Sequence, residues 1–264
     1  MTESRLLVTR EHAVARVTLN RPEVHNAFDE HLIAQLTEAF EELAADPETR
    51  CVVLSGAGRS FSAGADLSWM RRTADYDEAA NLEDARRLER MLGALDELPK
   101  PTIAMVNGAA MGGGVGLIAA CDIAIAAERA VFALSEVRLG LVPAVISPYV
   151  LRAVGDRACR RYFLTGERFD AAEARRIGLL HEVVPETDLE LRTLEIAEAV
   201  LAGGPEAQAE AKSLLRLCRA LEGSLLGEAT ARMIAKRRAS AEGREGVGAF
   251  LEKRPPAWRR NREV

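Results

Sequence analysis

Apolar and polar positions alternate in two short runs near the start of the chain and then change to helical spacing. Residues 6–9 and 14–19 flank a polar turn, which predicts a β-hairpin. Asp29 is a favourable helix N-cap, and apolar residues follow it three or four positions apart. These are Leu32, Leu36, Ala39, Phe40 and Leu43. A helix is therefore expected up to Asp46-Pro47, followed by a buried strand at 52–54.

The middle of the chain alternates between apolar runs and amphipathic segments. The polar stretch 71–80 is expected to be a mobile loop or a loose helix, and 82–98 has helical spacing that ends at Pro99. Buried strands are expected at 102–106 and 123–127, with a small-residue helix at 115–120 between them. This alternation of strands and helices predicts an α/β fold with a mainly parallel sheet.

Beyond residue 143 the pattern becomes helical. Helices are expected at 156–165 and, capped by Asp170, at 171–176, with a short link at 182–185. From residue 187 to 253 the pattern is helical, with breaks at Gly203-Gly204-Pro205 and at Gly223. We therefore divide the chain into a core at 1–186, which carries the candidate site, and a C-terminal helical region at 187–264.

Charge and composition narrow the classes of partner and compartment. The net charge of −5 argues against nucleic acid as the main partner. The four cysteines have no paired spacing, which indicates free thiols, and the four histidines have no metal-ligand spacing, so no metal site is expected. No stretch is apolar enough for a leader or a membrane span, so we expect a cytoplasmic protein without a membrane partner.

The candidate chemistry lies in the stretch 100–143. Three glycines, Gly112, Gly113 and Gly114, stand between a buried strand and a helix, where unpaired N–H groups can meet negative charge. Glu136 follows in an otherwise apolar run. Two interpretations stay open from this spacing: an oxyanion site beside a general base, or a tight turn with one exposed glutamate.

The two glycine-rich loops do not match a nucleotide motif. Phe61 and Leu117 stand where the third glycine of G-x-G-x-x-G belongs, and no G-K-[ST] is present. Ser60 is not in a nucleophile elbow. Each loop does follow a buried strand, so one backbone N–H from each could converge on a single oxygen. That arrangement suits a thioester or another acyl substrate.

Longer motifs carry a resemblance that covers essentially the whole chain. The sequence resembles the enoyl-CoA hydratase/isomerase, or crotonase, superfamily in F-S-A-G-A-D-L, N-G-A-A-M-G-G-G, F-A-L-S-E-V-R-L-G-L-V-P and G-A-F-L-E-K-R. The resemblance implies a core of repeated ββα turns that form a spiral, with C-terminal helices that build trimers, often paired into hexamers. It also implies an acyl-CoA substrate and no separate cofactor, since coenzyme A is part of the substrate.

The resemblance also implies roles for individual positions. The N–H groups of Ala65 and Gly113 would form the oxyanion hole, and Glu136 would be the acid/base. Hydratases of the family usually carry a second glutamate where this chain has Gly116, so Glu136 is left as the only family-matched carboxylate. The implied substrate- and CoA-binding residues are Ala63, Ala65, Asp66, Leu67, Ser68, Gly113, Phe250 and Lys253, the last two often serving a neighbouring subunit.

Within the superfamily, the sequence around A-V-I-S-P-Y is similar to that of bacterial 3-methylglutaconyl-CoA hydratases of leucine breakdown. This likeness implies reversible hydration of 3-methylglutaconyl-CoA to 3-hydroxy-3-methylglutaryl-CoA. The alternatives are a generic enoyl-CoA hydratase, a Δ3–Δ2 enoyl-CoA isomerase, and a non-catalytic scaffold that binds CoA or RNA. Candidates for binding the substrate's distal carboxylate are Arg71, Arg72, Ser147 and Tyr149.

Overall fold

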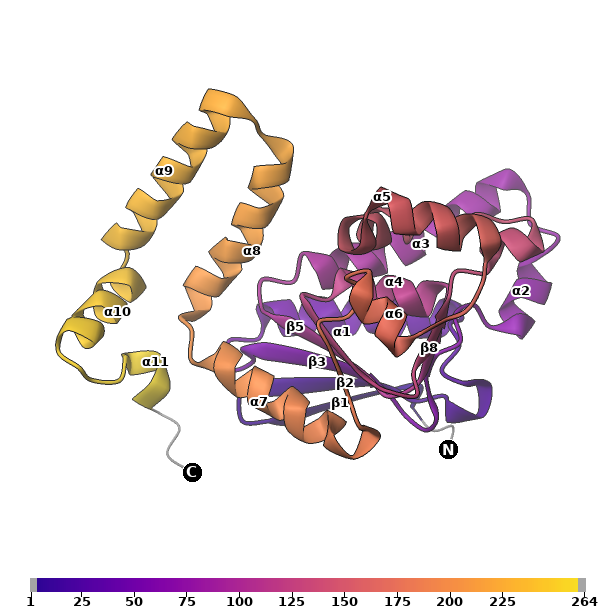
Figure 1. Cartoon of the computed structure of the whole chain (residues 1–264), viewed down its shortest axis with the longest axis horizontal. Helices are drawn as coiled ribbons and strands as arrows, with labels where there is room; N and C mark the ends of the chain where they lie inside the picture. Colours follow the sequence, from indigo (N-terminus) through magenta and orange to yellow (C-terminus); the bar gives the residue numbers. More distant parts are fainter. Residues whose placement is uncertain (1–3, 261–264) are drawn as a thin grey trace.

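A computed structural model describes residues 4–260 of the chain, which form two β-sheets wrapped by helices (Figure 1). The larger sheet has the strand order β1-β2-β3-β5-β7-β10. Its strands are β1 (Leu6–Glu11), β2 (Val14–Leu19), β3 (Cys51–Gly56), β5 (Thr102–Val106), β7 (Ile123–Ala127) and β10 (Glu182–Val184). The smaller sheet has the order β4-β6-β8-β9. Its strands are β4 (Ser60–Ser62), β6 (Ala109–Met111), β8 (Val131–Ala133) and β9 (Phe169–Asp170).

The two sheets arise from a repeated unit along the chain. Strands β3, β5 and β7 of the larger sheet are each followed at once by a short strand of the smaller sheet, β4, β6 and β8. Helices then follow each pair: α2 (Leu67–Thr73) and α3 (Glu78–Asp96), then α4 (Gly113–Ala120), then α5 (Ser147–Thr165). The repeated ββα unit confirms the α/β fold with a crotonase-like spiral core.

Successive residues of the larger sheet face opposite sides and build two separate cores. On one side, Val52 and Leu54 of β3 pack with α3, α4 and α1 (Glu30–Ala45). On the other side, Val53 packs with Leu189 and Leu201 of α7 (Leu189–Leu201). Burial on both faces explains why the parallel strands have near-continuous apolar sequences.

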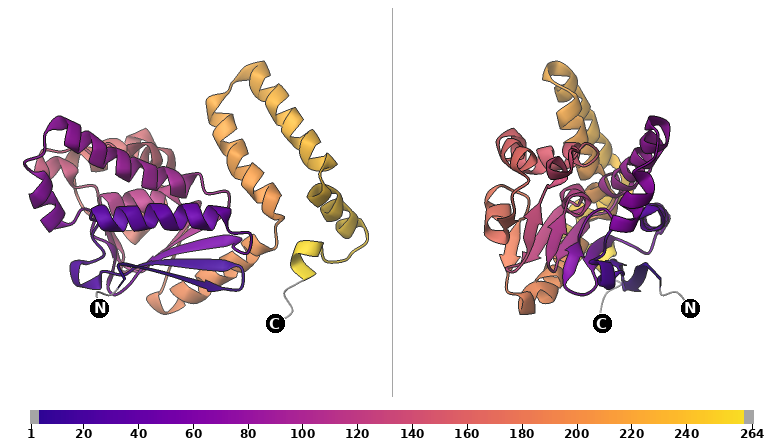
Figure 2. Two further views of the ribbon diagram at one scale, coloured as in Figure 1. Left: turned by 180° about the vertical axis from the view of Figure 1, so that it is seen from behind. Right: turned by 90° about the vertical axis from the view of Figure 1, so that its right-hand side faces the viewer.

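The C-terminal helices form an arm that projects from the core (Figures 1 and 2). The arm comprises α8 (Pro205–Ala220), α9 (Gly223–Ala239), α10 (Ala241–Leu251) and α11 (Ala257–Arg260). The expected breaks at Gly203-Gly204-Pro205 and Gly223 are confirmed, since α8 begins at the proline and α9 at Gly223. Helix α7 follows the predicted division after residue 186, yet it packs on the larger sheet of the core. The division itself stays a prediction.

The N-terminal hairpin and the first helix are confirmed. Asp29 caps α1, its Oδ1 accepting a hydrogen bond of 2.9 Å from the Leu32 N–H. Helix α3 begins at Glu78 rather than 82, because Asp77 Oδ1 caps it by accepting from the Ala80 N–H at 2.8 Å. Of the stretch 71–80, expected to be a mobile loop or a loose helix, residues 71–73 end α2 and residues 78–80 begin α3, so only 74–77 connect the two helices.

Two further expectations differ from the structure. Helix α5 begins at Ser147 and not near residue 156 as expected. The helix is interrupted at Gly155, where φ is +75°, so the predicted helix corresponds to its second part. The link expected at 182–185 is strand β10, which pairs in parallel with β7. The remaining connecting elements are the 3₁₀ turns η1 (Pro22–Val24), η2 (Glu136–Leu139) and η3 (Glu186–Asp188), and helix α6 (Ala171–Arg176). No helix within residues 4–260 is long and apolar enough to cross a membrane.

Candidate active site

The candidate residues lie at one edge of the smaller sheet. Strands β4, β6 and β8 are adjacent and parallel, so their carboxyl ends meet. Ala65 follows β4, Gly113 follows β6 and Glu136 follows β8, each within three residues of its strand. Ligands of open parallel sheets bind outside the carboxyl ends of the strands. The topology therefore brings together the two predicted loops, after β4 and after β6, and places the predicted Glu136 at the same edge.

The loop after β4 leaves one backbone donor free. Phe28 N–H donates to the Gly64 carbonyl at 2.6 Å, and Asp66 N–H donates to the Phe28 carbonyl at 2.7 Å. These bonds form a parallel bridge between Phe28 and Ala65, in which the Ala65 N–H takes no part. Within the described residues the Ala65 N–H has no hydrogen-bond partner, and Ala65 itself is exposed.

The glycine turn after β6 supplies the second donor. Gly112 has φ of +48°, a conformation that favours glycine, and its N–H donates to the Ala133 carbonyl of β8 at 2.9 Å. Helix α4 begins at Gly113, whose N–H likewise lacks a partner in the part of the chain described. A Cβ added to Gly64 would lie 3.6 Å from the Gly113 nitrogen, so the two loops are in contact. The N–H groups of Ala65 and Gly113 therefore lie in two loops that touch, and the N-terminus of α4 adds partial positive charge beside them.

Glu136 lies beside the same turn. Its Oε1 is 3.0 Å from the position that a Cβ on Gly112 would occupy, and its Oε2 is buried with no hydrogen-bond partner among the described residues. Burial raises the pKa of this carboxyl, and the hydrogen bond from its own backbone N–H only partly opposes that effect. A raised pKa makes the ionised carboxyl a stronger base, which suits it to take a proton and return it.

The raised pKa predicts that Glu136 destabilises the folded chain at neutral pH. The folded state binds this proton more tightly than the unfolded state, so stability is lost as pH rises from the unfolded pKa of 4.5 through the higher folded pKa. We expect Glu136→Gln to have a higher urea midpoint than the unsubstituted protein at pH 7, with the difference narrowing towards about pH 4.5. Equal midpoints at pH 7 would contradict the burial argument, and exposed Glu128→Gln is the matched control.

Asp66 and two residues that the sequence analysis did not select hold the first loop in place. Asp66 Oδ1 accepts from the Ser68 and Trp69 N–H groups at 2.7 and 3.1 Å, and its Oδ2 pairs with Arg21 at 2.9 Å. Burial opposes ionisation, but these donors outweigh it and lower the pKa of Asp66. Fully buried Asn26 donates to the Ala57 and Ser60 carbonyls at 2.9 and 2.8 Å. In the sequence, the only sign of these roles is that Arg21 and Asn26 are polar residues in the short stretch between the N-terminal hairpin and the first helix.

Comparison with known proteins agrees with this geometry. Residues 9–261 match the sequence profile of a family described as enoyl-CoA hydratase/isomerase. The chain belongs to the enoyl-CoA hydratase/isomerase family. It is similar to a putative enoyl-CoA hydratase of Thermus thermophilus, at 37% identity over 93% of this chain and 97% of the relative. It is also similar to the 2,3-dehydroadipyl-CoA hydratase of Escherichia coli, at 38% identity over 97% and 99%.

A solved structure shows the same fold. The crystal structure of an enoyl-CoA hydratase from Shewanella pealeana matches with a TM-score of 0.94 and 45% identity, covering 97% of each chain. Membership supports an enzyme that acts on acyl-CoA thioesters, with enoyl-CoA hydration as the general activity.

Two residues implied by the family resemblance lie apart from this edge. Phe250, at the end of α10, is 81% exposed, and Lys253 follows it with φ of +54°. Both belong to the arm, which lies on the opposite side of the molecule from α2 in Figure 1. Leu67 and Ser68 at the start of α2, and Ala63 before them, are exposed beside the candidate edge. Within one chain the structure therefore groups the loop residues but does not bring Phe250 and Lys253 to them.

The four candidates for a distal carboxylate differ in their surroundings. Arg72 already pairs with Glu30 at 2.8 Å, and Ser147 Oγ donates to the Ala144 carbonyl at 2.8 Å. Tyr149 is buried, and the Arg152 guanidinium lies 5.5 Å from its ring centroid. Arg71 on α2 is exposed and has no ion pair within the described residues. Arg71 is therefore the candidate whose positive charge makes no ion pair among the described residues.

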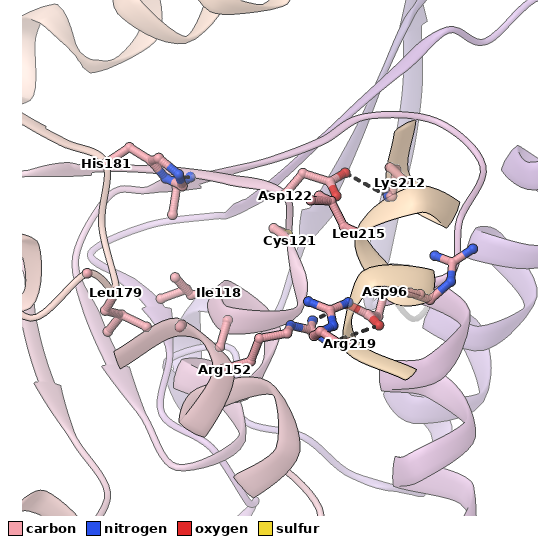
Figure 3. A pocket seen from close by; sticks show the side chains of 15 residues that line it. Asp96, Ile118, Cys121, Asp122, Arg152, Leu179, His181, Lys212, Leu215 and Arg219 are labelled. Carbon is pink, nitrogen blue, oxygen red and sulfur yellow. Dashed lines mark hydrogen bonds and ion pairs between the residues drawn. The ribbon is translucent and has the colours of Figure 1, made fainter. Parts of the chain in front are cut away.

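A cavity of about 300 Å³ lies elsewhere, between α8 and the core (Figure 3). Its lining includes Ile118 and Cys121, at the end of α4 opposite Gly113. Lys212 of α8 reaches Asp122 at 2.7 Å and the Lys100 carbonyl at 3.1 Å. These contacts anchor the arm to the core.

In residues 4–260 no group of three or more His, Cys, Asp or Glu side chains is arranged to hold a metal ion.

Proposed function

We propose that this member of the family hydrates an enoyl-CoA, namely 3-methylglutaconyl-CoA to 3-hydroxy-3-methylglutaryl-CoA, or catalyses the reverse dehydration. The observation that carries the proposal is the half-buried Glu136, whose buried Oε2 lies beside the N–H groups of Ala65 and Gly113, which have no partner among the described residues. The thioester oxygen would accept from both N–H groups. Because the negative charge of the enolate develops on that oxygen, the donors stabilise the transition state more than the substrate.

In this proposal one carboxyl carries the proton through the reaction. Glu136 takes a proton from water as the water oxygen bonds to C3, and the C2–C3 π electrons move towards the thioester to form the enolate. Glu136 then returns the proton to C2, and the enolate collapses to the thioester. One water is added across the double bond, and both donors hold the oxygen throughout.

A branched dicarboxylic acyl group is favoured by two observations. The stretch A-V-I-S-P-Y resembles that of bacterial 3-methylglutaconyl-CoA hydratases. The Escherichia coli relative is named for 2,3-dehydroadipyl-CoA, whose acyl group also ends in a carboxylate. In this chain Arg71 is the cation proposed to meet that carboxylate, since Arg72 is paired with Glu30.

A panel of substrates tests the acyl group. We expect kcat/KM to be highest for 3-methylglutaconyl-CoA in hydration and for 3-hydroxy-3-methylglutaryl-CoA in dehydration. Crotonyl-CoA lacks both the distal carboxylate and the methyl branch at C3, and it should be at least about 10-fold lower, because one missing group in a fitted pocket already has that effect. A preference for crotonyl-CoA would indicate a generic hydratase. Conversion of a 3-enoyl-CoA to its 2-enoyl isomer without hydration would indicate the isomerase, which the glycine at 116 also allows because that reaction needs one base.

We also propose that the chain forms a homotrimer or a dimer of trimers through its C-terminal arm. Exposed apolar side chains along α9 and α10 support this assembly, because a solvated arm gains stability by covering them. They are Leu225, Ile234, Val247, Phe250 and Leu251. In such an assembly Phe250 and Lys253 would serve the site of a neighbouring copy, as the family resemblance implies.

A further inference from the structure

Gly112 is the N-cap of α4, and Gly116 lies in the first turn of that helix. The Gly116 N–H donates to the Gly112 carbonyl at 3.2 Å, so the two glycines are neighbours at the start of the helix. The Glu136 carboxyl lies opposite Gly112, with Oε1 3.0 Å from an added Cβ. Ile146 lies opposite Gly116, with its own Cβ 2.9 Å from an added Cβ and its Cγ2 closer still. The carboxyl and the isoleucine therefore lie against two neighbouring glycines at the start of α4.

Ile146 is fixed in this place. It is 3% exposed, and its carbonyl accepts from the Tyr149 and Val150 N–H groups at 3.2 and 3.1 Å at the start of α5. Its branched Cβ allows few rotamers, so the side chain cannot swing away from α4. Any side chain at position 116 would overlap the backbone-proximal atoms of Ile146, not the end of a flexible chain.

We propose that Ile146 is a specificity-determining and positioning residue, which fills the place where a carboxylate at 116 would project and keeps that side of the site apolar. The inference rests on the proposed function. An apolar wall beside Glu136 favours an acyl group with an alkyl branch at C3, because the branch leaves water for an apolar contact. Burial raises the pKa of Glu136, and in this proposal Ile146 contributes to that burial.

The substrate test compares 3-methylglutaconyl-CoA with glutaconyl-CoA, which differ by one methyl group. The unsubstituted enzyme is expected to prefer the methylated substrate by about 10-fold or more in kcat/KM. Ile146→Ala should abolish most of that preference, and Ile146→Val should retain it. Ile146→Thr should shift the acidic limb of the kcat/KM profile to lower pH, because its hydroxyl solvates Glu136.

Val150→Ala is the matched control, since Val150 is 1% exposed in the same core cluster. It should lose stability without changing the substrate ratio or the pH profile. An active enzyme whose substrate ratio is the same for Ile146→Ala as for Val150→Ala would overturn the inference. If the unsubstituted enzyme were inactive on 3-methylglutaconyl-CoA, glutaconyl-CoA and crotonyl-CoA, the proposed function would instead be overturned.

A stability cycle tests the packing independently of activity. Gly116→Ala should lower the urea midpoint more in the unsubstituted chain than in the Ile146→Ala background, because the closest overlap, with Cγ2 of Ile146, is then removed and only the contact with its Cβ at 2.9 Å remains. Gly93→Ala is the control, since nothing lies within 4 Å of its added Cβ in α3, and it should maintain or raise the midpoint. Additive losses from Gly116→Ala and Ile146→Ala would overturn the packing on which the inference depends.

Discussion

Glu136→Gln is expected to lower kcat for hydration by about 10²–10⁴-fold, the usual contribution of general acid–base catalysis. The amide has almost the shape of the carboxyl but neither takes a proton from water nor returns one to C2. No other family-matched carboxylate is present to replace it, because position 116 is glycine and faces Ile146. The loss should therefore be nearly complete rather than partial.

Stability separates this effect from misfolding. Oε2 of Glu136 is buried without a partner among the described residues, so the fold does not depend on its charge. The variant should remain folded, with a urea midpoint at pH 7 no lower than that of the unsubstituted protein. Exposed Glu128→Gln should leave kcat unchanged. Full turnover by a folded Glu136→Gln variant would rule out the proposed proton carrier.

Ala65→Pro is expected to lower kcat/KM by about 10²–10³-fold, the cost of removing one oxyanion donor. Proline removes the backbone N–H, which at position 65 makes no hydrogen bond within the described fold. The bridge to Phe28 uses the Gly64 carbonyl and the Asp66 N–H, and both remain in the variant. Gly113 is less suitable for this experiment, because an added Cβ there would lie 2.6 Å from Phe28 Cε2.

The control for Ala65→Pro is Ala65→Gly, which removes the methyl group and keeps the donor. It should retain kcat/KM within a few-fold, as expected when only a small exposed side chain is lost. Urea midpoints of both variants report whether the loop is intact. If a folded Ala65→Pro enzyme matched Ala65→Gly in kcat/KM, the Ala65 N–H could not be an oxyanion donor.

The sequence predicted the larger sheet better than the smaller one. Strands β3, β5 and β7 have continuous apolar sequences because both of their faces are buried. Strands β4, β6 and β8 have three residues each, too few to show a period. The convergence of Ala65, Gly113 and Glu136 depends on those short strands. The two loops after buried strands already allowed such a convergence, but the family resemblance was needed to assign the donors to Ala65 and Gly113 and the acid/base to Glu136.

The packing at Gly116 shows a second limit. The sequence shows that a glutamate position carries glycine, but not what occupies the space. Ile146 lies 30 residues further along the chain, and only the tertiary structure places it against Gly116. In the same way, the roles of Arg21 and Asn26 depend on loop contacts with no periodic signal in the sequence.

The central claim is tested most directly by hydrating 3-methylglutaconyl-CoA in water enriched in ¹⁸O and measuring the product by mass spectrometry. We predict that the unsubstituted enzyme yields 3-hydroxy-3-methylglutaryl-CoA with one ¹⁸O in its C3 hydroxyl group. Consumption of the substrate without incorporation of ¹⁸O, or no consumption by an enzyme that hydrates crotonyl-CoA, would contradict the account.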